Sequence, residues 1–234
     1  MWYKKRKFND SEIQKGVILV KINIYTENFD IQVRLAQLNL TESALIEAVK
    51  IGQLARTKLT SNHPRIFHGY SAWAETVARL REVLLPLGWE KSDKGNYELV
   101  TNELLELAIA VATGNEFTGF PHATPSNKCP KGMNTIEAIN TNNQMDLIQE
   151  FVELIPLESS VNKDSYSTWI LLYHFAKDEI RCELSLPSEI DTDGRIIGWK
   201  ERIILNSIPL GETPIEVRPT ENQDINIEIR RKAS

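Results

Sequence analysis

The sequence predicts an α+β fold, with a helix-rich N-terminal half and a mainly antiparallel, meander-type sheet in the C-terminal third. Three observations predict it. Apolar residues recur at helical spacing within 41–84, a continuous apolar run occupies 107–112, and alternating runs begin at residue 168. We expect a helix-rich α/β part over residues 1–155 and an antiparallel β part over residues 164–234, which together form one compact domain.

The first predicted elements are a strand and two helices. Residues 16–26 are rich in β-branched side chains, which favours a strand. Thr41 suits a helix N-terminus, and the helix that follows it must end before Pro64. A second amphipathic helix is expected from Ser71 to the proline at position 86, which stops it.

The middle of the chain combines a buried strand with an unusually long loop. The apolar run 107–112 is interpreted as a strand rather than a helix. Residues 113–134 carry three glycines and three prolines without periodic hydrophobicity, and loops of this length are usually functional. A short helix is expected over 135–148, and 156–163 is the expected linker between the two halves.

Alternating runs in the last third predict the strands of the meander. The first two are joined at Lys177-Asp178 as a hairpin, and the turn Asp191-Thr192-Asp193-Gly194 precedes the third. The five expected strands are 168–176, 179–186, 195–205, 214–218 and 225–230.

Composition excludes some classes of protein. The chain has 234 residues and a formal net charge of −5, which argues against a protein that coats nucleic acid through a basic surface. Every apolar run is shorter than about 18 residues, so no membrane-spanning helix and no membrane partner are expected. Cys129 and Cys182 lie in dissimilar surroundings and are expected to be free thiols, which indicates a cytoplasmic location.

Four segments resemble a family of uncharacterised bacterial proteins. They are LREVLLPLGW at 80–89, IAVATGNEFTG at 109–119, SNKCPKG at 126–132 and TWILLYHFAKDEIRCELSLP at 168–187. The resemblance covers about residues 54–205. It implies a bacterial source and carries no activity, fold or site.

The long loop holds the first candidate site. Lysines, a hydroxyl group and exposed backbone amides supply the charge and the hydrogen-bond donors that a phosphate group needs. The candidate residues for phosphate or nucleic-acid binding are His122, Ser126, Asn127, Lys128 and Lys131. The alternative is a surface loop that packs its own prolines over the sheet.

The predicted hairpin holds the second candidate site. A two-residue turn places His174 opposite Arg181, and one solvated face then shows the candidate catalytic residues His174, Glu179, Arg181 and Glu183. Such a set suits acid–base or Mg²⁺-assisted phosphodiester chemistry. The alternative is an ordinary cross-strand ion-pair ladder completed by Lys200 and Arg202.

Other patterns in the sequence give weaker indications of a functional site. The histidines and cysteines lack zinc-type spacing, so no metal site is expected. Arg56 and His63 have the spacing of some helical ribonucleases, although a histidine at a helix end also serves as a cap.

The sequence therefore favours an intracellular bacterial binding or accessory module within a larger assembly, whose partner is a protein or a nucleic acid contacted through the 113–134 loop. One alternative is a Mg²⁺-dependent nuclease or phosphodiester-acting enzyme that uses the 174–183 sheet face, and a cofactor, Mg²⁺, is expected under this alternative alone. Another is a small-molecule binding protein with its pocket between the two halves. The sequence leaves the oligomeric state open.

Overall fold

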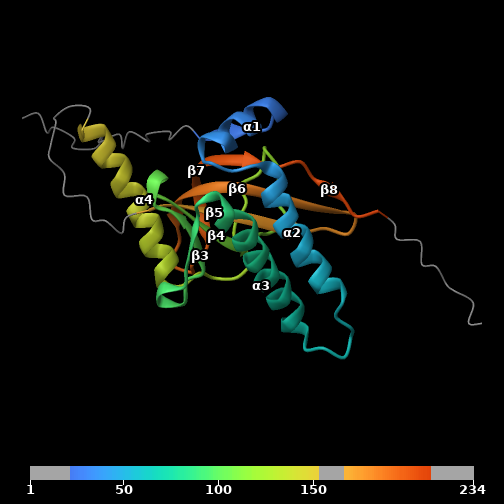
Figure 1. Ribbon diagram of the computed structural model, residues 1–234. Coiled ribbons are helices and arrows are strands. Elements are labelled where there is room, and N and C mark those ends of the chain that lie inside the picture. The colour runs from blue at the N-terminus through green and yellow to red at the C-terminus, as the bar shows by residue number, and fades with distance from the viewer. Residues whose placement is uncertain (1–21, 153–165, 212–234) are drawn as a thin grey trace, which may run out of the picture.

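The computed structural model describes residues 22–152 and 166–211, and it confirms an α+β fold (Figure 1). The helices are α1 (Asn28–Gln37), α2 (Glu42–Thr57), α3 (Arg65–Leu84) and α4 (Met133–Val152), with short 3-10 helices at Leu85–Leu87, Lys94–Asn96 and Glu103–Leu105. The strands are β1 (Asn23–Tyr25), β2 (Glu90–Ser92), β3 (Leu99–Asn102), β4 (Leu107–Thr113), β5 (Ser167–Phe175), β6 (Glu179–Ile190), β7 (Ile196–Ile204) and β8 (Ile208–Pro209).

All described strands belong to one mixed sheet. Its order is β1-β7-β6-β5-β4-β3-β2, and β8 pairs with β6. Strand β1 runs parallel to β7 and β4 runs parallel to β5, whereas the other pairs are antiparallel. The prediction of a mainly antiparallel sheet confined to the C-terminal third is therefore wrong.

The parallel pair β4–β5 explains this error. Parallel neighbours require a crossover connection, whereas antiparallel strands need only a tight turn. In the described residues, the connection from β4 to β5 consists of the long loop followed by α4. Helix α4 packs against β5 and β6. The loop is thus part of a crossover, and β4 is buried almost throughout because both faces of the sheet are covered.

Two apolar clusters lie on the two faces of the sheet. The larger one joins residues of α1, α2 and α3 to one face, including Leu35, Leu45, Leu80 and Leu171. The smaller one joins Ile139 of α4 to the other face. The helices therefore form separate layers, as Figure 1 shows by the position of α4 apart from α2 and α3.

The helix predictions are confirmed in type but not always in extent. Helix α2 begins as predicted, with the Thr41 side chain accepting a hydrogen bond from the Ala44 amide at 3.3 Å. Helix α3 begins at Arg65 rather than Ser71, because Pro64 occupies the residue before the first turn, where its missing N–H is not needed. Helix α4 is longer than predicted at both ends.

The strand predictions at 107–112, 168–176, 179–186 and 195–205 are confirmed by β4, β5, β6 and β7. In the predicted turn, Asp191 Oδ1 accepts hydrogen bonds from the amides of Asp193 at 2.9 Å and Arg195 at 2.8 Å. The structure places β1 within the predicted strand 16–26, of which residues 16–21 lie outside the described residues. The predicted strands at 214–218 and 225–230 and the linker at 156–163 also lie outside them.

Helix α1 and the strands β2, β3 and β8 were not predicted from the sequence. Helix α1 buries Ile31 and Leu35, which have the i, i+4 spacing of one helix face. Strands β2 and β3 are short, and their connection has left-handed backbone at Gly95 and Asn96. In the described ranges, no helix is long and apolar enough to cross a membrane.

Candidate functional site

The register of the β5–β6 hairpin is as predicted, but the face that it presents is largely covered. His174 pairs with Arg181, and Leu172 pairs with Glu183. Arg181 is only 7% exposed and Glu183 is fully buried. The covering loop, defined here as residues 114–132, contacts this face through the interactions given below. The expectation of an open face is therefore wrong for Arg181 and Glu183, whereas His174 and Glu179 are half-buried.

A buried ion pair joins β6 to β7 beneath the covering loop. Arg202 Nη2 donates to Glu183 Oε2 at 2.6 Å. The same guanidinium donates to the carbonyl oxygens of Ala123 at 2.8 Å and Phe120 at 3.1 Å. Burial raises the pKa of the Glu183 carboxyl, and the Arg202 guanidinium opposes that rise. The pair thus fixes the loop to the sheet.

Two other candidate catalytic residues also contact the covering loop. The Arg181 guanidinium lies 3.9 Å from the Phe120 ring centroid, and its Nε lies 3.3 Å from Glu179 Oε1. His174 Nδ1 lies 3.3 Å from the Gly114 carbonyl oxygen. Arg181 Nη1 and Glu183 Oε1 have no hydrogen-bond partner in the described residues.

This arrangement does not resemble a Mg²⁺ site. Within residues 22–152 and 166–211, no group of three or more His, Cys, Asp or Glu side chains is placed to hold a metal ion. The Arg56 and His63 side chains make separate contacts, since Arg56 lies over the Phe175 ring at 5.4 Å and His63 Nδ1 accepts from the Thr60 amide at 3.1 Å.

Asn127 anchors the covering loop to the β6–β7 turn. Its Nδ2 donates to the carbonyl oxygens of Cys129 at 2.6 Å and Gly194 at 2.8 Å. Its Oδ1 accepts from the Ile196 amide at 2.7 Å. Because the side chain is buried and both ends of the amide are engaged, Asn127 is placed to hold backbone rather than a ligand.

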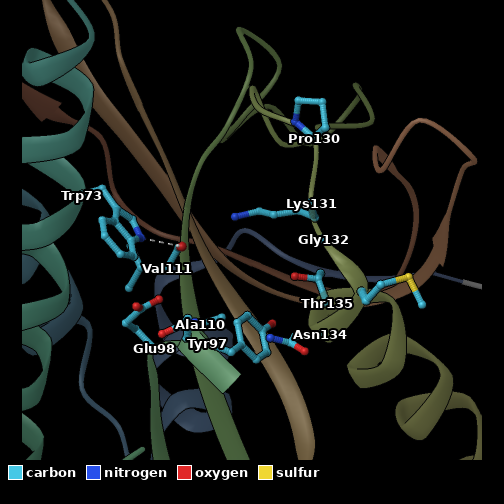
Figure 2. Close-up of a pocket in the computed structure, with 12 residues that line it drawn as sticks. Trp73, Tyr97, Glu98, Ala110, Val111, Pro130, Lys131, Gly132, Asn134 and Thr135 are labelled. Atoms are coloured by element: carbon cyan, nitrogen blue, oxygen red, sulfur yellow. Dashed lines mark hydrogen bonds between the residues drawn. The ribbon is translucent and has the colours of Figure 1, made fainter. Parts of the chain in front are cut away.

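The structure does not bring the five loop candidates to one point. His122 and Lys128 are exposed, Ser126 is half-buried and Asn127 is buried. Of these residues, only Lys131 lines the described cavity. Figure 2 shows its side chain extending toward β4, with the ammonium nitrogen on the side of Trp73 and Val111.

The cavity has a volume of about 350 Å³ and lies beside β4, just beyond the N-terminal residue of β3. Leu99, the first residue of β3, pairs with Ala110 of β4, so the next residue of β4, Val111, has no pairing partner in β3. Its carbonyl oxygen instead accepts from Trp73 Nε1 at 3.2 Å. The cavity is lined by Trp73, Asn96, Tyr97, Glu98, Ala110, Val111, Pro130, Lys131, Gly132, Met133, Asn134 and Thr135.

The backbone of Lys131 is held by the β6–β7 turn. The Lys131 amide donates to the Gly194 carbonyl oxygen at 2.9 Å. Gly194 has φ +72°, and a Cβ atom there would lie 2.6 Å from the Lys131 carbonyl oxygen. This close approach therefore requires glycine, and it fixes the point from which the Lys131 side chain enters the cavity.

Lys131 is the cation of the cavity. Its Nζ has neither an ion pair nor a hydrogen bond in the described part of the chain. Burial lowers the pKa of its ammonium group, and the carboxylate of Glu98 acts in the opposite direction without forming an ion pair. A half-buried ammonium group without a partner is a costly arrangement, which an anion entering the cavity would relieve.

The N-terminus of α4 adds to the positive potential of the cavity. The Gly132 carbonyl oxygen accepts from the Thr135 amide at 3.1 Å, so the first turn of the helix borders the cavity. Asn134 Nδ2 donates to the Gly95 carbonyl oxygen at 2.8 Å, which ties α4 to the β2–β3 connection. Burial raises the pKa of the Tyr97 phenol.

Sequence reasoning missed most of this lining. Trp73, within the predicted helix that starts at Ser71, is half-buried and packs against the larger apolar cluster, and Tyr97 and Glu98 stand in a segment without a predicted element. No local pattern marks these residues, because the cavity forms between segments that are distant in sequence. The hypothesis of a pocket between the two halves also differs from this cavity, whose lining lies within residues 73–135.

Comparisons with known proteins give no assignment. No family model matches the chain, and no curated protein or solved structure matches it.

Proposed function

We propose that the protein is a binding protein for a small anionic molecule, which enters the cavity beside β4 and contacts Lys131. One observation carries the proposal: the Lys131 ammonium group points into a cavity of about 350 Å³ and has no partner in the described residues (Figure 2). Buried charges in proteins are normally paired, so an unpaired one beside a cavity suits an ionic ligand.

The lining limits the chemistry of the ligand. The volume is near the lower end of the range of about 300–1,000 Å³ for ligand pockets, which favours a small molecule. Lys131 and the N-terminus of α4 favour a carboxylate or phosphate group. Glu98 offers a hydrogen-bond acceptor for an amine or a hydroxyl group. We therefore expect a small organic acid or phosphate ester that also carries a donor group.

This proposal fits the geometry better than the other functions predicted from the sequence. The nuclease hypothesis needs accessible, unpaired carboxylates, whereas Glu183 is buried and paired with Arg202, and Glu179 is half-buried and paired with Arg181. The nucleic-acid hypothesis for the loop needs its cations on one surface, whereas Lys131 is turned into the cavity and Lys128 is exposed. Membership of a larger assembly stays a prediction.

The proposal is tested by calorimetric titration of the full chain at low chloride concentration. The probes are inorganic phosphate, short hydroxycarboxylates and α-amino acids. We expect at least one probe to bind to the wild-type protein, and we expect Lys131→Gln to weaken that binding at least about tenfold, which corresponds to about 1.4 kcal/mol. Loss of a hydrogen bond to a charged group has about this magnitude.

The matched control is Lys128→Gln, which removes the same charge from an exposed position of the same loop. It should leave the affinity within about twofold, since exposed charges contribute little. Equal weakening by both variants would mean that only the general charge of the loop matters. Either that result or no binding of any probe to the wild-type protein contradicts the proposal.

A further inference from the structure

A row of aromatic rings begins at the α2–α3 connection and continues along α3. The ring centroids of His63 and Phe67 are 6.2 Å apart, those of Phe67 and Tyr70 are 6.4 Å apart, and those of Tyr70 and Trp73 are 5.6 Å apart. Their spacing of three to four residues places them along one side of the helix. Phe67 is 42% exposed and Tyr70 is 60% exposed, so these two rings are available to a partner.

The start of the row lies on a part of the molecule that projects from the sheet. Helices α2 and α3 form an antiparallel pair, and Figure 1 shows their connection well away from the strands. The His63 ring at this connection is held in place, because Nδ1 accepts from the Thr60 amide at 3.1 Å. The start of the row is therefore fixed before any partner binds.

The same segment is basic in an otherwise acidic protein. The whole chain has 32 Asp and Glu against 27 Lys and Arg, yet no acidic residue occurs between Glu47 and Glu75. The basic residues in that interval are Lys50, Arg56, Lys58 and Arg65. This distribution gives the projecting pair of helices a local positive potential, which attracts an anionic partner.

Arg65 differs from the other described arginines. Arg34, Arg79, Arg81, Arg181 and Arg202 form ion pairs with carboxylates, Arg195 donates to a carbonyl oxygen, and Arg56 lies over a ring. Arg65 makes none of these contacts in the described part of the structure, and it is exposed one residue before Ile66, which is 84% exposed. Its guanidinium group is thus available for a phosphate contact.

We propose that single-stranded nucleic acid docks on this basic aromatic row, with its bases on Phe67 and Tyr70 and its phosphates on Lys58 and Arg65. Flat exposed rings stack on any base, and cations of the same projecting segment attract the phosphate backbone. An acidic protein partner would contact the cations but would not need the row of rings. In a duplex the faces of the bases are stacked on one another and cannot contact the rings. Trp73 at the end of the row also lines the cavity beside β4, but the four side chains assigned to the nucleic acid are not among the residues that line it.

The experiment measures fluorescence anisotropy of labelled oligothymidylate and oligouridylate with the full chain. We expect binding that weakens with salt, and we expect the double variant Phe67→Ala/Tyr70→Ala to reduce affinity at least about fivefold. The matched control is Phe29→Ala, which removes a ring that is 77% exposed on α1 and should leave affinity within about twofold. Both ring variants should unfold at the wild-type temperature, because the rings are exposed.

The phosphate contacts have a separate measurement. The double variant Lys58→Gln/Arg65→Gln should make the slope of log affinity against log salt shallower by about 1.4, since each phosphate contact on a single strand contributes about 0.7. Lys131→Gln should leave oligonucleotide binding unchanged, so failure here and failure of the cavity proposal are distinguishable. The proposal is overturned if the oligonucleotides do not bind at low salt. Equal binding of duplex DNA, anionic vesicles or polyglutamate would also overturn it.

Discussion

The covered face of the sheet and the cavity beside β4 both place a basic side chain near a carboxylate, but only one of them leaves the cation unpaired. On the covered face, Arg202 lies 2.6 Å from Glu183. In the cavity, Lys131 is near Glu98 without an ion pair. The same residue types thus stabilise the packing of the loop on the covered face, whereas in the cavity the cation is available to a ligand.

The difference arises from what each region contacts. Arg202 binds two carbonyl oxygens of the covering loop as well as Glu183, so its interactions connect a loop and two strands. Lys131 extends into the space that β3 leaves beside β4, where no strand supplies a partner (Figure 2). Pairing, rather than residue type, therefore separates the two regions.

The largest expected effect is the loss of stability on breaking the covered ion pair. Glu183→Ala leaves the buried guanidinium of Arg202 without its carboxylate, and we expect the free energy of unfolding to fall by about 3–5 kcal/mol. Urea denaturation followed by circular dichroism measures this change. The corresponding change in the cavity, Lys131→Gln, should not lower stability, since it removes an unpaired ammonium group from a half-buried position.

A double variant separates the charge from the packing. Glu183→Leu together with Arg202→Met replaces both charges by apolar groups, and it should be more stable than Glu183→Ala. If Glu183→Ala and Lys131→Gln change stability equally, the distinction between a paired and an unpaired region is wrong.

The next effect concerns the anchor of the covering loop. Asn127→Ala removes hydrogen bonds to the backbone of Cys129, Gly194 and Ile196, and it leaves these groups without their partners. We expect a loss of about 2–4 kcal/mol in the free energy of unfolding, since each unsatisfied buried group costs about 1–3 kcal/mol. Ser126→Ala, a change at the neighbouring half-buried position, is the control and should have a smaller effect. If Asn127 does not anchor the loop, Asn127→Ala and Ser126→Ala should lower the free energy of unfolding by the same amount.

Local rules predicted the parts of the molecule that local interactions decide. The Thr41 cap and the Asp191 turn depend on nearby backbone, and both are confirmed. The pairing of His174 with Arg181 follows from a two-residue turn and is confirmed as well. These features needed no knowledge of the rest of the chain.

The environment of the candidate sites depends on distant contacts, which the sequence pattern does not contain. Alternation predicted that Arg181 and Glu183 share a face, but whether water or the covering loop lies on that face depends on contacts such as that of Arg202 with Phe120. Lys131 was identified within a cluster of polar loop residues, whereas its neighbour Trp73 in the cavity comes from α3. Residue type identified candidates, and tertiary packing decided which ones a ligand can reach.

The smallest expected effect follows from the lowered pKa of Lys131 and sharpens the contrast between the regions. An anion needs the ammonium form, so affinity should fall by up to about tenfold per pH unit above the pKa of Lys131, and this fall should begin below the ordinary lysine value of about 10.4. Lys131→Arg keeps its charge and should remove the fall. The measurement is a calorimetric titration of the tightest probe across alkaline pH.

Without ligand, the same group should give a pH dependence of opposite sign. The unfolded chain holds the Lys131 proton more tightly than the folded one, so this residue makes stability rise as pH increases between the two pKa values. Burial raises the pKa of Cys182 and Tyr173 to about 12, and these groups lower stability with rising pH in every variant. Subtracting the profile of Lys131→Gln from that of the wild type therefore isolates Lys131. The stability difference between the two proteins and the affinity for the probe could both be independent of pH below the ordinary lysine pKa. The ammonium group would then be as well solvated as an exposed lysine, which contradicts the proposal of an ionic ligand in the cavity.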